Sequence, residues 1–477
     1  MAPLTYLFPL FLLFGLTQSR TTPHSSKTTL LNVASSLQNA HNVVSFTHHR
    51  QQPSLLTPFS IHLHSRASIQ KPSHSDYKSL TLARLARDSA RVRALQTRLD
   101  LALNRVSNSD LNVNPAESGD EFQANALQGP IVSGTSQGSG EYFLRVGIGK
   151  PSSQAYVVLD TGSDVSWIQC APCSECYQQS DPIFDPVLSS SYSPIHCDAP
   201  QCKSLDLSEC RNGTCLYEVS YGDGSYTVGE FATETVTLGS AEVSGVAIGC
   251  GHNNEGLFVG AAGLLGLGGG KLSFPAQVNA TSFSYCLVDR DSDAVSTLEF
   301  DSPLPRNAVT APLMRNPELD TFYYLSLKGI SVGGEALPIP DSSFEVDAIG
   351  GGGIIVDSGT AVTRLRSEVY DTLRDAFVNG TRALPKANSV SLFDTCYDLS
   401  SRNSVEVPTV SFHFPEGKEL PLPAKNYLIP VDSVGTFCLA FAPTTSSLSI
   451  IGNVQQQGTR VGFDIANSLV GFSANSC

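Results

Sequence analysis

The sequence predicts an all-β body of two similar lobes with few short helices, preceded by a signal peptide and a prosegment. From about Ile131 onward, short apolar and β-branched runs alternate with Gly, Pro, Asn and Ser, which is typical of strands and turns. An apolar motif built around an aspartate occurs twice in this body, 197 residues apart, as expected for two related lobes. The chain ahead of the body is basic and begins with an uncharged apolar run.

Composition excludes several classes of protein. Of the 477 residues, 41% are hydrophobic and 16% are charged, which indicates a folded chain rather than a disordered one. The net charge of -14 argues against a nucleic-acid partner, because phosphate binding needs a basic surface. The charge is unevenly spread: residues 20–128 carry 12 Lys and Arg against 7 Asp and Glu, a net of +5, and seven of the ten histidines. The rest of the chain carries 18 basic and 37 acidic residues, a net of -19.

The first residues read as a secretory signal peptide. The apolar run from Leu4 to Leu16 is followed by small residues at Thr17 and Ser19, so we place cleavage near Ser19 and a signal peptide over residues 1–19. A run of about 13 residues is too short to span a bilayer, which takes about 20, and we expect no membrane anchor. We expect entry into the secretory pathway and an extracellular (apoplast) destination, with the endoplasmic reticulum and the vacuole left open.

Residues 20–128 read as a prosegment with its linker. A helix is predicted over residues 79–103, where Leu85, Val92, Leu95 and Leu99 share a face. Four arginines lie around that face, at positions 84, 87, 91 and 98. Residues 20–75 show no clear periodicity, and residues 104–126 are polar and suit a processing linker.

The charge difference predicts how the prosegment acts. At neutral pH the basic segment is expected to dock on the acidic body and cover its cleft as a strand and a helix. In acid the attraction fades because the body carboxylates protonate near their ordinary pKa values of about 4. The histidines gain charge near pH 6.5 and add repulsion within the prosegment.

Within the body, four runs illustrate the predicted strands. These are residues 142–148, 155–159, 235–238 and 322–327. One helix is predicted over residues 367–377, with Ser367 as its cap and Val369, Leu373 and Phe377 repeating at spacing four.

The repeated motif carries the predicted chemistry. Residues 157–163 read Val-Val-Leu-Asp-Thr-Gly-Ser, and residues 354–360 read Ile-Ile-Val-Asp-Ser-Gly-Thr. A second apolar signature follows each of them, at residues 264–267 and 450–452. An apolar strand thus delivers each aspartate, Asp160 and Asp357, to a tight loop in which a glycine permits close approach.

Two facing carboxylates share one proton, because both cannot ionise cheaply. The ionised one activates a water molecule and the protonated one polarises a carbonyl. The pattern therefore predicts amide hydrolysis in acid without metal or cofactor. The neighbouring hydroxyls and glycines are expected to hold and orient the two carboxylates: Thr161, Gly162, Ser163, Ser358, Gly359 and Thr360.

With these loops the chain resembles the pepsin-like aspartic proteases over nearly all of residues 138–477. Trp167, the only tryptophan, follows the first aspartate by seven residues, and Tyr221 lies in Ser220-Tyr-Gly-Asp-Gly-Ser225. The resemblance implies a bilobal double barrel, catalytic Asp160 and Asp357, a flap carrying Tyr221 and Gly222, and Trp167 as its support. It further implies an N-terminal lobe over 129–305, a C-terminal lobe over 306–477, a monomer acting on protein or peptide substrates, and the prosegment as intramolecular inhibitor.

Twelve cysteines, an even number in an exported chain, predict six disulfides but leave their connectivity open. A metal site at Cys170-x-x-Cys173-x-x-Cys176 is disfavoured, because Ser180 stands where a ferredoxin pattern needs a fourth cysteine. The Cys-rich insert over 170–215 is similar to that of plant nepenthesin-like enzymes, and in particular to the group called aspartic protease in guard cell. That resemblance implies the pairs Cys170–Cys173, Cys176–Cys250, Cys197–Cys215, Cys202–Cys210, Cys286–Cys477 and Cys396–Cys438.

The sequence also predicts glycosylation sites and leaves one alternative function open. Three sequons suit N-glycosylation in an exported chain, at Asn212, Asn279 and Asn379. The alternative function is a non-catalytic binding or inhibitor protein with the same fold. Both aspartate loops, Tyr221 and Trp167 are intact, which favours the enzyme.

Overall fold

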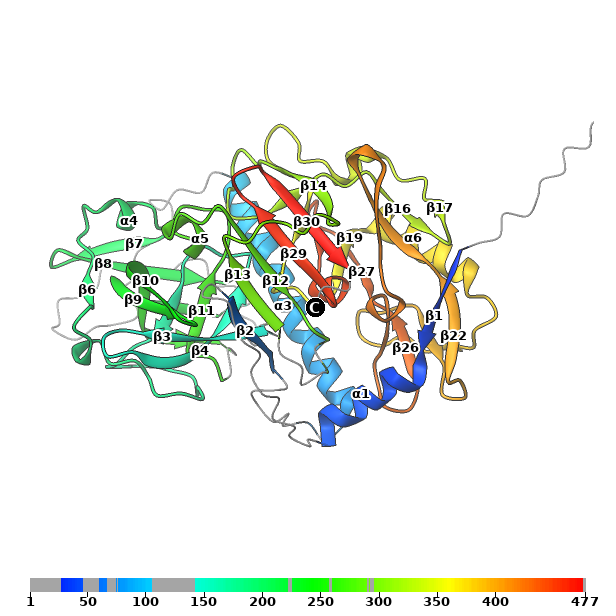
Figure 1. The fold of residues 1–477 in the computed structure, drawn as a ribbon, viewed down its shortest axis with the longest axis horizontal. Helices are drawn as coiled ribbons and strands as arrows, with labels where there is room; N and C mark the ends of the chain where they lie inside the picture. The colour runs from blue at the N-terminus through cyan, green and yellow to red at the C-terminus, as the bar shows by residue number, and fades with distance from the viewer. Residues whose placement is uncertain are drawn as a thin grey trace, which may run out of the picture.

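The computed structural model describes residues 27–45, 60–66, 74, 76–104, 142–221, 225–256, 260–289, 291 and 296–474. The predicted signal peptide, linker residues 105–128, Gly222 and Cys477 lie outside these residues. Figure 1 shows a two-lobed arrangement in which the long helix α3 (Tyr77–Leu103) passes between the green and cyan strands on the left and the yellow and orange strands on the right. Within the described residues, no helix is long and apolar enough to cross a membrane.

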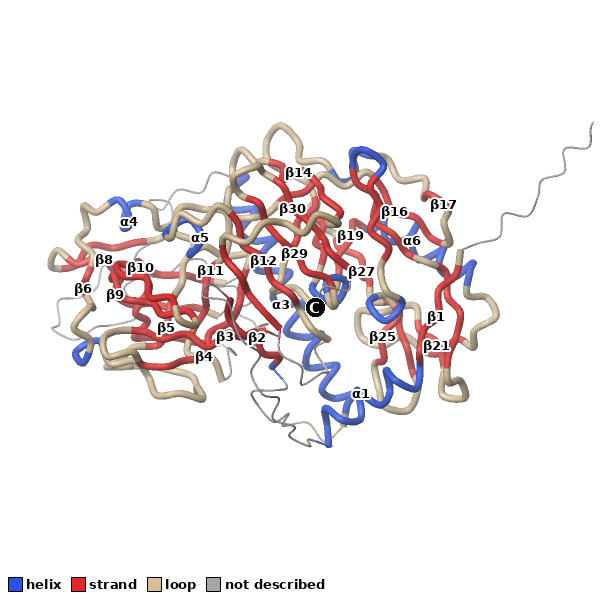
Figure 2. The backbone as a smooth tube through the Cα atoms, in the orientation of Figure 1, coloured by secondary structure: helices blue, strands red, loops and turns tan. Residues whose placement is uncertain are grey.

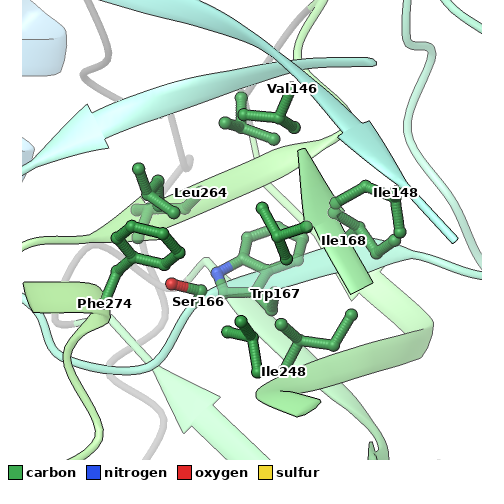
Figure 3. Close-up of a pocket in the computed structure, with 12 residues that line it drawn as sticks. Val146, Ile148, Ser166, Trp167, Ile168, Ile248, Leu264 and Phe274 are labelled. Atoms are coloured by element: carbon green, nitrogen blue, oxygen red, sulfur yellow. The ribbon is translucent and has the colours of Figure 1, made fainter. Parts of the chain in front are cut away.

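The first lobe is built on antiparallel strands that continue into a closed barrel. Strand β3 (Tyr142–Ile148) and the long hairpin β9 (Tyr226–Leu238) with β10 (Ala241–Glu255) form its frame. The other strands of this part are β4 (Ser153–Asp160), β5 (Trp167–Gln169), β6 (Ser193–Pro194), β7 (Ser208–Arg211), β8 (Thr214–Ser220) and β11 (Gly263–Gly266). Figure 3 shows Trp167 inside this barrel, among Ile148, Ile168, Ile248 and Leu264 around a small apolar cavity.

Strands from distant parts of the chain meet in the middle of the molecule, where Figure 2 shows them side by side. β29 (Thr459–Asp464) pairs with β12 (Ser282–Cys286) and with β30 (Leu469–Ala474), which also pairs with β14 (Val309–Met314). β13 (Ser296–Phe300) pairs with β12 and with β2 (Ser60–Ser65), and β2 in turn pairs with β3. A strand from the predicted prosegment is therefore part of the body sheet.

The second lobe carries the remaining strands. The sheet continues through β15 (Tyr324–Leu325), β18 (Ile354–Val356), β19 (Thr363–Arg366), β27 (Phe441–Thr444) and β28 (Ser449–Ile451). One four-stranded sheet contains β16 (Gly329–Val332), β17 (Glu335–Ala336), β23 (Val410–Phe414) and β24 (Lys418–Pro421). Another contains β20 (Lys386–Ala387), β21 (Cys396–Asp398), β25 (Leu428–Pro430) and β26 (Thr436–Leu439).

The segment predicted as a prosegment contains elements that its sequence did not predict. β1 (Thr28–Asn32) pairs antiparallel with β22 (Ser404–Pro408), and α1 (Val33–Ser45) follows it directly. The predicted helix over 79–103 is confirmed as α3, which Asp76 caps by accepting a hydrogen bond from the N–H of Ser79.

Two predictions for the body need correction. β15 covers only Tyr324–Leu325 of the run 322–327, because its antiparallel partner β14 pairs with it only through Leu313 and Met314. Ser367 is the first residue of α6 (Ser367–Gly380) rather than its cap, and its hydroxyl donates to the carbonyl of Thr444. The short helices are α4 (Pro200–Lys203), α5 (Phe274–Gln277), α7 (Asn453–Gln456) and the 3-10 turns η2 (Pro186–Leu188), η3 (Asp341–Phe344), η4 (Pro415–Gly417) and η5 (Ala424–Asn426).

Candidate active site

Each aspartate of the repeated motif ends a buried strand that pairs in parallel with the second apolar signature. β4 ends at Asp160, which lies opposite Gly266 of β11. β18 leads into Asp357, and its Val356 lies opposite Ile451 of β28. The two signatures are therefore the parallel partners of the aspartate strands, which explains why both recur in each lobe.

The two carboxylates are fully buried and each is held by its own loop. The hydroxyl of Ser163 donates to Asp160 Oδ2 at 2.6 Å, and the hydroxyl of Thr360 donates to Asp357 Oδ2 at 2.6 Å. The N–H of Gly162 reaches Asp160 Oδ1 at 3.0 Å. These bonds fix both side chains in orientation.

The other two hydroxyls join the loops to each other. The N–H of Thr161 donates to Ser358 Oγ at 3.2 Å, and the N–H of Ser358 donates to Thr161 Oγ1 at 2.9 Å. Thr161 Oγ1 is also 3.4 Å from Asp357 Oδ1. The reciprocal bonds keep the two aspartate loops at a fixed separation.

The guanidinium of Arg91, from the middle of α3, lies between the two carboxylates. Its Nη2 donates to Oδ1 of both Asp160 and Asp357, at 3.1 Å for the latter, and its Nη1 donates to Asp160 Oδ2 at 3.0 Å. Its Nε donates to Asp357 Oδ2 at 3.3 Å. A planar fork of donors suits this bridge in a way that a single ammonium group does not.

The close fit explains the two loop glycines. A Cβ at Gly162 would lie 2.2 Å from Arg91 Nη2 and 2.9 Å from Leu95, and one at Gly359 would lie 3.0 Å from Arg91 Cζ. A side chain at either position would require Arg91 to move from its place between the carboxylates.

Arg91 and Asp357 change each other's proton affinity. Burial alone would raise the pKa of Asp357, but Arg91 and the hydrogen bonds from Thr360 and Gly359 outweigh it and lower that pKa below the usual range. The pKa of Arg91 is raised despite its burial, because both carboxylates favour its charged form. The docked helix therefore favours an ionised Asp357 beside a permanent cation.

Three arginines spaced seven residues apart lie along one side of α3. Arg84 pairs with Asp291 at 2.7 Å, Arg91 bridges Asp160 and Asp357, and Arg98 lies 3.1 Å from Asp206 and 3.6 Å from Asp164. Burial raises the pKa of Asp164, although Arg98 and the hydroxyl of Thr321 act in the opposite direction. The sequence predicts that these arginines lie on the helix but does not identify their partners; the only local signal is their seven-residue spacing.

The apolar side of the same helix packs on the second lobe. Val92, Leu95 and Leu99 form a buried cluster with residues of β15, β18 and β28. Leu85 belongs to another cluster that includes Ala361 and Val362, directly after the second aspartate loop. The predicted apolar face of residues 79–103 is thus the face that docks.

Tyr221 and Trp167 lie together beside this centre. The indole N–H of Trp167 donates to the hydroxyl of Tyr221 at 2.8 Å. Burial and the nearby Asp160 raise the pKa of Tyr221, so its hydroxyl stays protonated. Gly222, expected beside it, lies outside the described residues.

The disulfide pairing corrects several expectations. Cys396–Cys438 forms as expected, since these residues face each other on β21 and β26. Cys170 pairs with Cys250 rather than with Cys173, because the residues of β5 just before Cys170 run parallel to β10 at Cys250, which brings the two Cα atoms to 5.3 Å. Cys176 consequently pairs with Cys173.

In the insert, the observed pairs are Cys197–Cys210 and Cys202–Cys215, and the expected pairs 197–215 and 202–210 are wrong. Cys210 and Cys215 lie opposite each other in the β7–β8 hairpin, so their partners come from the segment around α4. Cys286 is disulfide-bonded, but Cys477, its expected partner, lies outside the described residues. The sequon residues Asn212, Asn279 and Asn379 are all exposed.

Comparisons with known proteins agree with this architecture. Residues 142–301 match the family model described as Xylanase inhibitor N-terminal, and residues 322–474 match the one described as Xylanase inhibitor C-terminal. Among solved structures, one titled as edgp superposes with a TM-score of 0.59 at 21% identity, covering 71% of this chain and 93% of that one. The basic 7S globulin from soybean gives a TM-score of 0.56 at 20% identity, covering 71% of this chain and 94% of that chain, and shares the fold.

Similarity to curated proteins is much higher. The chain is 55% identical to Aspartyl protease family protein 2 of Arabidopsis thaliana, over 83% of this chain and 81% of that protein. It is 46% identical to Protein ASPARTIC PROTEASE IN GUARD CELL 2 of the same plant, over 94% and 92%. It is 41% identical to aspartic proteinase nepenthesin-1 of Nepenthes gracilis, over 74% and 82%.

Proposed function

The chain belongs to the pepsin-like aspartic proteases, and on this premise we propose that it is a secreted zymogen whose Asp160 and Asp357 hydrolyse peptide bonds in acid. The observation that carries the proposal is the convergence of both carboxylates, one from each aspartate loop, on a single nitrogen of Arg91. Two carboxylates close enough to share that nitrogen are close enough to share a water molecule and a proton once Arg91 has left.

The chemistry follows from the pair. Without Arg91, Asp160 and Asp357 lie too close for both to ionise, so they hold one proton between them, as is established for aspartic protease dyads. The ionised carboxylate takes a proton from water as the water oxygen bonds to the scissile carbonyl carbon, and the protonated carboxyl donates to the carbonyl oxygen. The carboxyl that took the water proton then donates it to the amide nitrogen, and the other carboxylate takes a hydroxyl proton of the tetrahedral intermediate as the C–N bond breaks. The products are an amine and a carboxylic acid, and the dyad again holds one proton.

Tyr221 is proposed to close over the substrate. Its hydroxyl is held by the indole of Trp167 beside Asp160, and its raised pKa keeps it neutral there. In this role Tyr221, with Gly222, excludes water and positions the substrate while Trp167 supports the flap.

The prosegment, residues 20–128, is proposed as an intramolecular inhibitor. Support comes from Arg91, which occupies the hydrogen-bonding positions of both carboxylates, and from β2, which is paired on both sides within the body sheet. Substrate and attacking water have no access to the dyad while α3 is docked. Removal of the signal peptide at residue 19 and cleavage in or near residues 104–128 would leave lobes of residues 129–305 and 306–477.

Secretion is supported by the disulfides, because such bonds persist in oxidising compartments. We propose the apoplast as the destination, protein or peptide substrates, and glycans on the exposed Asn212, Asn279 and Asn379. The alternative, a non-catalytic binding protein of this fold, is disfavoured because both aspartate loops keep their full set of hydrogen bonds.

Hydrolysis of denatured haemoglobin in acid tests the function, with and without pepstatin. The variants Asp160→Asn and Asp357→Asn, activated in trans, are expected to lose several orders of magnitude in rate because neither carboxylate can do both proton tasks. Asp341→Asn, which alters an exposed carboxylate outside the aspartate loops, is the matched control and should keep full activity. More than a few per cent of wild-type activity in either dyad variant contradicts the assignment.

A further inference from the structure

In one contact between α3 and the body, the helix supplies the anion and the body supplies the cation, the opposite of the arginine contacts described above. Asp88, an acidic residue of the prosegment, is fully buried and accepts hydrogen bonds from the backbone N–H groups of Ala361 and Val362, which follow the second aspartate loop. Its other oxygen binds Nη2 of Arg364 at 2.6 Å. A carboxylate that receives two backbone N–H groups and a guanidinium occupies a built anion site.

Arg364 belongs to the body and stays there when the prosegment leaves. Its side chain is 5% exposed, and among the described residues its hydrogen bonds are to Asp88 and to the carbonyl of Val362, at 3.0 Å for the latter. Throughout the part of the chain that the structure describes, Asp88 is its single ion-pair partner. Loss of α3 therefore leaves a cation and two N–H donors that are arranged for a carboxylate and are free to bind another anion.

The site lies close to the dyad. Asp88 precedes Arg91 by three residues, a rise of about 4.5 Å along a helix. A bound peptide in extended form advances about 3.3 Å per residue. With Arg91 marking the position of the scissile carbonyl, Arg364 is within reach of a substrate side chain no more than about three residues from the cut.

We propose that Arg364, with the N–H groups of Ala361 and Val362, forms a specificity subsite of the mature enzyme for an Asp or Glu side chain of the substrate. The substrate carboxylate takes the place that Asp88 holds in the precursor. The inference rests on the proposed peptidase function and on removal of the prosegment.

Few other charges compete at this position. The elements β27, β28 and α7, which pack against β19, contain no titratable residue. Helix α6 carries four charged residues, Glu368, Asp371, Arg374 and Asp375. Glu368 pairs with Arg366, and Arg374 pairs with Asp371, Asp375 and Asp394. Asp357, four residues before Ala361, belongs to the dyad. The substrate carboxyl itself is thus the group whose ionisation governs the preference.

The test uses mature wild-type enzyme and a library of fluorogenic peptides in which Glu and Gln are exchanged at each position within four residues of the cut. At one position we expect Glu to raise kcat/KM over Gln by roughly 10- to 100-fold, the range for a hydrogen-bonded charge pair. Because a free Glu has a pKa of about 4.3, the ratio should fall toward one as the pH drops below about 4. A ratio near one at every position and every pH overturns the proposal, and it does so without any variant.

Arg364→Met should lose the Glu preference at that position, and Arg364→Lys should keep part of it. Arg366→Met, which removes a more exposed arginine of the same strand, is the matched control and should retain the full ratio. A Glu preference that survives in Arg364→Met also overturns the proposal. Failure of the peptidase function is seen separately, as absence of cleavage of the Gln peptides by wild-type enzyme.

Discussion

Replacing Arg91 with methionine in the full-length precursor isolates the contact between the prosegment and the dyad. The substitution removes four hydrogen bonds to Asp160 and Asp357 and, among the residues that the structure describes, the one cation that contacts both. Removing one partner of a buried ion pair costs about 3–5 kcal/mol. We take the lower value of about 3 kcal/mol, since the two carboxylates can relieve their repulsion by sharing a proton. At 1.4 kcal/mol per tenfold change, the docking equilibrium should weaken by roughly 100-fold.

The assay is the initial rate of hydrolysis of a fluorogenic peptide by intact precursor at about pH 6, with gels confirming that no cleavage has occurred. Arg91→Met should be roughly 100-fold more active than the wild-type precursor, with Arg91→Lys between them because an ammonium lacks the planar fork. Arg93→Met, which alters an exposed arginine on the same helix, should match wild type. If the Arg91→Met precursor is as inactive as wild type, Arg91 does not hold the precursor closed.

The same contact sets the pH dependence of release. The pKa of Asp357 is lowered in the docked state, so the docking free energy that comes from it is present above the ordinary pKa of an aspartate. It is lost as the pH falls through the lowered value. Wild-type precursor should therefore stay intact and inactive at pH 7 and begin to lose its prosegment as the pH falls to about 4. Prosegment loss from Arg91→Met should depend less on pH.

Four further predictions concern processing, the flap and the disulfides. The Asp160→Asn precursor should remain uncut near pH 4 unless active enzyme is added, and self-cleavage of this variant would show that another group performs the cut. Tyr221→Phe removes the bond from Trp167, worth about 0.5–1.5 kcal/mol, so kcat/KM should fall roughly 2- to 10-fold; an unchanged value would contradict the flap role. Burial, with the charges of His62 and Arg145, lowers the pKa of His64; protonation therefore opposes docking below the ordinary value of about 6.5, and His64→Gln should move the pH midpoint of prosegment loss downward, as read on gels. Mass spectrometry of non-reduced peptides should recover the five pairings described above, and 170–173 linked peptides would contradict them.

Local patterns in the sequence identified the aspartate loops and their strands. Asp160 and Asp357 each follow a short run of apolar residues. Such a run, followed by turn residues, is typical of a buried strand. Helix α3 was equally accessible, because its apolar positions recur at helical spacing over 27 residues. The hydroxyl and glycine residues that surround the two carboxylates were also predicted, because they belong to the repeated motif.

Features that depend on pairing between distant segments were not accessible. The partner of Cys170 is decided by the parallel pairing of β5 and β10, which is not visible in the spacing of the cysteines. Strand β2 is only six residues long and is stabilised by its neighbours β13 and β3 rather than by its own composition. The ion pair of Asp88 with Arg364 joins residues 276 positions apart, and no local signal marks either of them.

Net charge predicted that the prosegment would bind the body, but the contacts give a more specific reason. Exposed ion pairs are worth about 0–1 kcal/mol and are screened within about 8 Å at physiological salt, so a difference between +5 and -19 cannot by itself hold a helix in one register. Arg84, Arg91 and Asp88 are each nearly buried against a body residue of opposite charge. Asp88 is an acidic residue in the basic segment, opposite in sign to that segment's net charge. It pairs with Arg364, a buried cation of the acidic body. The position of α3 on the body therefore depends on matched, nearly buried charges along the helix, and two of the three partner groups belong to the proposed dyad and the proposed subsite.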